Sequence, residues 1–188
     1  MRRKPDMIFL KELNLQDVEK EYQYIVSVPA DENGFINDFY NAPRKNFETA
    51  VLQPLICQGQ GMDLPEGYVP QTHYLLWDDD IIVGWFRLRH YLCPSLINGA
   101  GHIGYSIREG FRGKGYATAG LRLMVEKAAK IIPENEIYLR VNKNNPASLR
   151  VMLKNGGYIH HEDQYQYYVR KIGKEYQLVL NGAKKYQD

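Results

Sequence analysis

Residues 111–120 read FRGKGYATAG, and this short stretch is the most informative part of the sequence. It holds three glycines and two cationic residues just before a run with the apolar spacing of a helix. Glycine weakens a helix, and positive charge is unfavourable at a helix N-terminus, so an ordinary helix would not begin this way. The pattern indicates a backbone that must come close to an anion.

The segments around this stretch predict alternating strands and helices. The helix after the glycines has apolar residues with a 3.6-residue period, and Pro133 ends it. A second helix begins at Asn145 and Pro146, which are typical of a helix cap and a first helical residue. The elements expected in this half are a strand at 102–107, a helix at 116–132, a strand at 136–141, a helix at 146–154, and strands at 158–162 and 164–172.

The N-terminal part carries weaker patterns. Residues 59–70 are rich in glycine and proline without periodicity, which is typical of a loop. No internal repeat or long linker divides the sequence, so we predict one domain over 1–188, of the α/β (α+β) class, with helices on a mixed sheet. The elements expected here are a strand at 7–14, a helix at 15–28, short helices at 32–40 and 44–58 joined at Pro43, a hairpin of 71–77 with 81–92, and a loop at 93–101.

Composition excludes several classes of protein. The 188 residues carry a net charge of only +2, which argues against a nucleic-acid partner. The two cysteines, Cys57 and Cys93, are far apart in the sequence and predict neither a disulfide framework nor a zinc site. The N-terminus lacks the apolar core of a signal peptide, and no stretch is long enough to cross a bilayer. We therefore expect a cytoplasmic protein with no metal and no membrane partner.

A strand, a glycine turn and a helix together form a phosphate-binding device. Gly113 and Gly115 remove side chains that would hold a phosphate away from the free N–H groups of the helix, and Arg112 and Lys114 suit a diphosphate. The Walker pattern fails because Tyr116 stands where lysine is needed. The dinucleotide fingerprint GxGxxG also fails, because its third glycine is replaced by threonine.

Residues 112–117, RGKGYA, resemble the [Q/R]xxGx[G/A] signature of the GNAT-type acyl-CoA N-acyltransferases. The later run RVNKNNPASLRVMLKNGGY, residues 140–158, resembles the second motif of that family, in which an asparagine begins a helix that ends at a glycine and an aromatic residue. The resemblance covers 72 to about 170 well and 1–70 only in outline. Within the family, the sequence most resembles a bacterial-type subgroup whose acceptors are small or unknown.

The resemblance implies a mostly antiparallel sheet that splays apart between strands 102–107 and 136–141. Acetyl-CoA would lie with its diphosphate on the N–H groups of 113–117 and its pantetheine arm along the first of these strands. Asn145 also has a simpler interpretation, because asparagine before proline caps helices in any protein. The implied cofactor-binding residues are Tyr105, Ser106, Ile107, Arg112, Gly113, Lys114, Gly115, Tyr116, Ala117, Asn142, Asn145 and Ser148.

The resemblance also implies a direct attack of an amine on the thioester. The N–H of Ile107 would then stabilise the developing oxyanion. His102 is the candidate base, because histidine titrates near neutrality and stands where histone-type members have a glutamate. The tyrosine that protonates the CoA sulfur in many members is Met152 here. Its substitute is either solvent or one of Tyr165, Tyr167 and Tyr168.

The predicted function is transfer of an acetyl group from acetyl-CoA to a primary amine on a small molecule or peptide. A non-catalytic acyl-CoA-binding module is the alternative, because Met152 cannot donate a proton. Residues 1–70 would form the acceptor side and 72–170 the acyl-CoA-binding core, and the sequence leaves a homodimer open. The carboxylates that would make the acceptor side attractive to a cation are Glu32, Asp38, Asp63 and Glu66.

Overall fold

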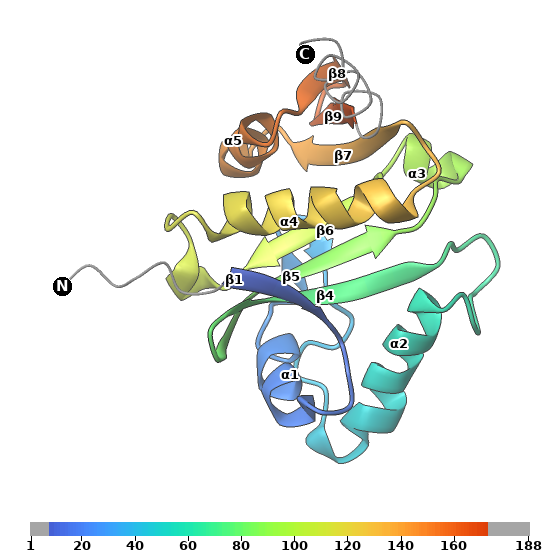
Figure 1. Cartoon of the computed structure of the whole chain (residues 1–188), viewed down its shortest axis with the longest axis vertical. Coiled ribbons are helices and arrows are strands. Elements are labelled where there is room, and N and C mark those ends of the chain that lie inside the picture. The colour runs from blue at the N-terminus through green and yellow to red at the C-terminus, as the bar shows by residue number, and fades with distance from the viewer. Residues whose placement is uncertain (1–7, 173–188) are drawn as a thin grey trace, which may run out of the picture.

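The computed structural model describes residues 8–172, which form two main β-sheets with helices packed against them (Figure 1). The larger sheet has the order β1-β4-β5-β6, the smaller has the order β7-β9-β8, and every strand pair within them is antiparallel. A short hairpin of β2 and β3 is separate from both. The strands are β1 (Ile8–Glu12), β2 (Asp31–Glu32), β3 (Phe35–Ile36), β4 (Gln71–Asp78), β5 (Ile81–Arg89), β6 (Ile103–Ile107), β7 (Glu136–Asn142), β8 (Tyr158–Glu162) and β9 (Gln166–Ile172).

Helices cover both faces of the larger sheet. α4 (Tyr116–Ile131) packs on one face against β1, β5 and β6, whereas α1 (Val18–Ile25) and α2 (Gln53–Gly59) pack on the other face, as Figure 1 shows. α5 (Pro146–Lys154) contacts α4 and β7. The remaining helical segments are the short α3 (Pro94–Ile97), 3-10 turns at Arg44–Asn46 and Glu109–Phe111, and a π-helical turn at Glu48–Leu52.

The central strands β4 and β5 supply side chains to two separate cores. Successive residues of a strand point to opposite faces. Leu75 and Trp85 accordingly pack with the α1 and α2 side, whereas Leu76 and Phe86 pack with α4. A Cβ atom at Gly120 would lie only 2.4 Å from the Phe86 ring, so glycine is what allows α4 to approach β5 this closely. This packing fixes the start of α4 over the edge of the sheet.

Most of the predicted elements are confirmed, but the segment 32–40 is not a short helix. It contains the turn and second strand of the β2–β3 hairpin, because Asn33 and Gly34 both have positive φ angles, 54° and 89°. An Asn-Gly pair with these angles is the usual two-residue hairpin turn. The predicted loop at 93–101 also contains α3. The predicted strand at 7–14 is β1, although Met7 lies outside the described residues, as do the ends of the predicted domain, 1–7 and 173–188.

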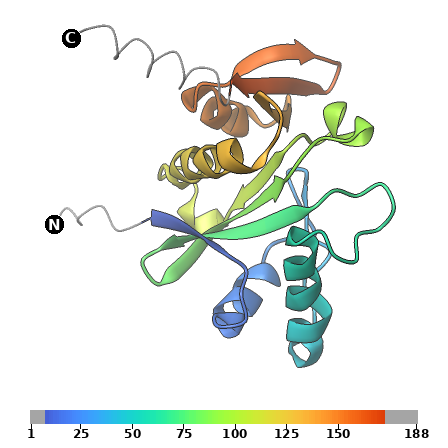
Figure 2. The ribbon, with the colours of Figure 1, turned by 45° about the vertical axis from the view of Figure 1, so that its right-hand side comes forward.

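The two main sheets meet at one end and diverge at the other. Gly101 forms an isolated bridge with Leu139, and the amide of His102 donates to the carbonyl of Tyr138 at 2.8 Å. Beyond this point no bridge joins β6 to β7 within the described residues, which confirms the predicted splay. Figure 2 shows the β8–β9 hairpin rising away from the larger sheet. No helix among residues 8–172 has both the length and the apolar character needed to cross a membrane.

Candidate functional site

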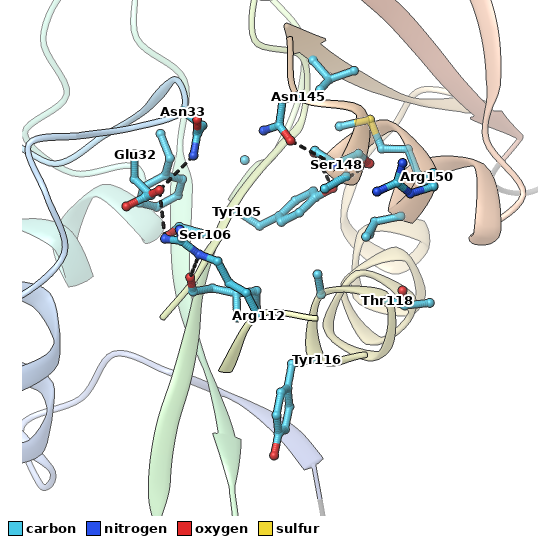
Figure 3. Close-up of a pocket in the computed structure, with 18 of the residues that line it drawn as sticks. Glu32, Asn33, Tyr105, Ser106, Arg112, Tyr116, Thr118, Asn145, Ser148 and Arg150 are labelled. Atoms are coloured by element: carbon cyan, nitrogen blue, oxygen red, sulfur yellow. Dashed lines mark hydrogen bonds and ion pairs between the residues drawn. The ribbon is translucent and has the colours of Figure 1, made fainter. Parts of the chain in front are cut away.

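A cavity of about 610 Å³ lies where the two sheets diverge. Its walls are β6, the end of β7, the N-terminal end of α4, α5 along its length, and the β2–β3 hairpin (Figure 3). This volume is within the usual range for small-molecule sites. The described side chains that line it include four cations, Arg112, Arg140, Arg150 and Lys154, and a single carboxylate, Glu32.

The glycine turn before α4 opens onto this cavity. Gly113 and Gly115 have φ angles of 73° and 90°, which favour glycine, and a Cβ atom at either would meet nothing within 4 Å. Gly115 is the N-cap, so no side chain caps the helix. Among the described residues, the amides of Gly113, Lys114, Gly115, Ala117 and Thr118 donate no hydrogen bond. The turn therefore presents free donors at the positive end of a helix dipole.

The two cations of the turn have different surroundings. Arg112 lines the cavity, where its Nε donates to the carbonyl of Ile107 at 3.0 Å and its Nη2 pairs with Glu32 at 2.9 Å. Lys114 points back instead, because its Nζ donates to the carbonyl of Gly110 at 2.8 Å. Of the two predicted phosphate ligands, only Arg112 is a wall residue of the cavity in this conformation.

The register of β6 leaves one edge of that strand open toward the gap. The amide of Arg89 bonds to the carbonyl of His102 at 2.9 Å, and the amide of Arg108 bonds to the carbonyl of Val83 at the same distance. Hydrogen-bonding direction alternates along an antiparallel strand, so the even-numbered residues between these two pairs bond to β5. The amides that face the gap therefore belong to Ile103, Tyr105 and Ile107.

The start of α5 forms the opposite wall. Asn145 caps this helix, because its Oδ1 accepts from the amide of Ser148 at 3.1 Å. The hydroxyls of Tyr105 and Ser148 lie 2.7 Å apart, and burial raises the pKa of Tyr105 to about 12. Asn142 lies at the end of β7, beside the same cavity. Figure 3 shows Tyr105 reaching from β6 across to α5.

A family model described as "Acetyltransferase (GNAT) domain" matches residues 8–157. The chain belongs to the GNAT acetyltransferase family. A comparison with curated protein sequences found no significant match.

Solved structures show the same GNAT fold at low sequence identity. A "Probable acetyltransferase" has a TM-score of 0.65 and 17% identity over 89% of this chain and 94% of its own. The ribosomal-protein-S5-alanine acetyltransferase from Vibrio fischeri has a TM-score of 0.60 and 13% identity. This match covers 93% of this chain and 97% of the acetyltransferase chain. The spermidine N-acetyltransferase from Vibrio cholerae, solved with CoA and spermine, has a TM-score of 0.58 and 14% identity. This match covers 90% of this chain and 98% of the spermidine acetyltransferase chain.

The structure of this GNAT protein argues against His102 as the base. His102 is fully buried and is absent from the cavity wall. Its Nδ1 accepts from the amide of Tyr138 at 2.9 Å, and its Nε2 lies 3.2 Å from the carboxylate of Glu134. Burial lowers the pKa of the His102 imidazole below its ordinary value. Both ring nitrogens are thus engaged at the junction of the sheets, so His102 has no part in the mechanism proposed below.

The substitute tyrosines also lie elsewhere in this GNAT domain. Met152, which cannot donate a proton, does line the cavity. Tyr165 is 68% exposed, and the hydroxyl of Tyr168 donates to Asp163 at 3.0 Å. Neither they nor Tyr167 are among the wall residues.

Sequence reasoning missed two parts of the wall. The β2–β3 hairpin was predicted as a helix, although the Asn33–Gly34 pair is a recognised hairpin signal. Arg150 and Lys154 were not singled out, although their spacing of four residues places them on one face of α5. The remaining predicted contacts, apart from Lys114, do surround one cavity.

Proposed function

We propose that the protein transfers an acetyl group from acetyl-CoA to a primary amine by direct attack within a ternary complex. The observation that carries the proposal is the set of free amides at the start of α4, which open onto a cavity with four cationic side chains. Free helix N-termini bind phosphate groups well. The spermidine N-acetyltransferase of similar fold has an amine acceptor in its name, in agreement with this reaction class.

The residues present fit the diphosphate and the pantetheine arm of CoA. Gly113, Gly115 and Ala117 would donate their amides to the diphosphate. The open edge of β6 would pair with the amide groups of the pantetheine arm, as a sheet edge pairs with an added strand. Asn142 and Asn145 flank this path from the other side.

The bound thioester supplies an activated acetyl group, and the chain supplies groups that act on it. The amide of Ile107 faces the gap and would donate to the thioester carbonyl oxygen, where negative charge develops. The hydroxyl of Tyr105 is protonated at neutral pH, and burial raises its pKa further, to about 12. The departing thiolate would take up the proton that the attacking amine gives up, and the hydroxyl of Tyr105, bonded to Ser148, would stabilise the sulfur as a hydrogen-bond donor.

The direct test combines cofactor binding with turnover. Acetyl-CoA at about a hundred times its Kd should raise the free energy of unfolding by about 2.7 kcal/mol. A panel of primary amines should then release free CoA thiol. Stabilisation without thiol release would favour the acyl-CoA-binding module instead, and no stabilisation by acetyl-CoA or CoA would contradict both functions.

Two substitutions at Asn145 should separate its capping role from its cofactor role. Asn145→Ala removes the cap and should lower the free energy of unfolding by about 1 kcal/mol. Asn145→Asp keeps an oxygen for the amide of Ser148, so stability should remain near that of the wild type. The aspartate cannot donate to the pantetheine arm, so acetyl-CoA affinity should still fall. Calorimetric titration and urea unfolding measure the two effects, and unchanged affinity in Asn145→Asp would leave Asn145 as a cap alone.

A further inference from the structure

The β2–β3 hairpin closes one side of the cavity. Phe35 anchors the hairpin, with its ring 5.3 Å from the Trp85 ring and beneath the guanidinium of Arg87. The turn extends toward β7, because a Cβ atom at Gly34 would lie 3.5 Å from Nδ2 of Asn142. The hairpin therefore holds its side chains at fixed positions along the gap between β6 and β7.

Glu32 is the residue of the hairpin that places a charged side chain in the wall of the cavity. Its side chain is only 15% exposed, and it is the single carboxylate among the described wall residues. Arg112 at 2.9 Å and Nδ2 of Asn33 at 2.9 Å both contact its Oε1. Its Oε2 accepts no hydrogen bond from any described residue. The second oxygen of this carboxylate is thus open to a ligand in the cavity that Glu32 lines (Figure 3).

Arg112 connects Glu32 to the proposed reaction centre. The same guanidinium bonds to the carbonyl of Ile107, whose amide is the proposed oxyanion donor. Glu32 therefore lies one side chain away from the place where the amine attacks. An ammonium held directly by a carboxylate stays protonated and cannot attack a thioester. Glu32 is better suited to a second cationic group on the acceptor than to the reacting amine itself.

We propose that the acceptor carries two basic groups, and that Glu32 holds one as a cation while the other reacts. This inference rests on the acetyl transfer proposed above and names the substrate class for it. Asp63 and Glu66 lie in the exposed loop before β4, and Asp38 is also exposed, so none of them offers the same site.

The ion pair also predicts an order of binding. In the structure Arg112 neutralises Glu32, and Arg112 directly precedes the turn that would bind the diphosphate. A bound diphosphate competes for the same guanidinium, because both anions suit arginine. Glu32 is then released for the acceptor cation, so the acceptor binds after acetyl-CoA.

The test compares 1,4-diaminobutane with 1-aminobutane as acceptors, using the release of CoA thiol to obtain kcat/KM. The wild type should prefer the diamine by at least about tenfold. Glu32→Gln should remove most of this preference, whereas Glu66→Gln, a matched change at an exposed carboxylate, should retain it. Equal use of both amines by the wild type, or an unchanged preference in Glu32→Gln, would overturn the inference while leaving acetyl transfer intact. Turnover of neither amine, with thiol release from another monoamine of the panel, would also overturn this inference alone, whereas no thiol release from any amine of the panel would overturn the proposed acetyl transfer as well.

A binding measurement on the wild type tests the same idea without a variant. Calorimetry with the diamine should show binding at least about tenfold tighter when CoA is present than when it is absent. Equal affinities with and without CoA would contradict the release of Glu32 by the cofactor.

Discussion

Replacing Gly115 with valine is expected to weaken acetyl-CoA binding by at least about a hundredfold, or about 2.8 kcal/mol. Gly115 has a φ angle of 90°, which a β-branched residue adopts only with strain. The turn must rearrange to relieve this strain, and the free amides then lose their common direction toward the cavity. Each hydrogen bond to a charged group is worth about 1.5–3 kcal/mol, so losing two of them accounts for the effect.

Gly67→Val is the matched control for this change. Gly67 has a φ angle of 80° and open space around its Cα, as Gly115 does, but it lies in the loop before β4, away from the cavity. Both variants should lose about 1–2 kcal/mol of stability from backbone strain. Only Gly115→Val should lose affinity in a calorimetric titration. Wild-type affinity in Gly115→Val would mean that the turn does not bind the cofactor.

The second large effect is a loss of stability with rising pH, caused by Glu21 on α1. The Glu21 carboxyl is 1% exposed, and burial raises its pKa from 4.5 to about 8. Between these two values the folded protein holds a proton that the unfolded chain releases. The stabilising contribution is therefore complete below about pH 4.5 and is lost as the pH rises to about 8. The full change is on the order of 5 kcal/mol.

Glu21→Gln should remove this dependence, because a neutral amide replaces the titrating carboxyl. The variant should be more stable than the wild type at about pH 9 by several kcal/mol, and urea unfolding at a series of pH values measures this. His102 and the other groups titrate in both proteins, so the difference between the two profiles isolates Glu21. Glu19→Gln, on the exposed side of the same helix, should give no such gain. A parallel pair of pH profiles for wild type and Glu21→Gln would contradict the assignment.

The glycine turn before α4 and the cap of α5 were predictable because their signals are local in the sequence. Gly113 and Gly115 need unusual backbone angles, and Asn145 caps its own helix, so neighbouring residues alone indicate each feature. The family resemblance, rather than the residue pattern alone, pointed to Ile107 at the edge of the gap.

The features of the site that the sequence did not predict depend on the three-dimensional contacts of individual side chains. The alternation of residues along a strand could not show that His102 would be buried beside Glu134, which lies 32 residues further along the chain. The Glu32–Arg112 pair joins a hairpin whose strands have only two residues each, too short to show alternation. Lys114 differs from Arg112 because one lysine contact, to the carbonyl of Gly110, turns its side chain away from the cavity.

An amide NMR titration can show whether the glycine turn binds the cofactor, when CoA is compared with pantetheine, which lacks both the diphosphate and the 3′-phosphoadenosine. Diphosphate binding at this turn predicts that CoA shifts the amide signals of Gly113 and Gly115 strongly and binds at least about a hundredfold more tightly than pantetheine. CoA binding that leaves these two signals in place, or equal affinity for CoA and pantetheine, would contradict it.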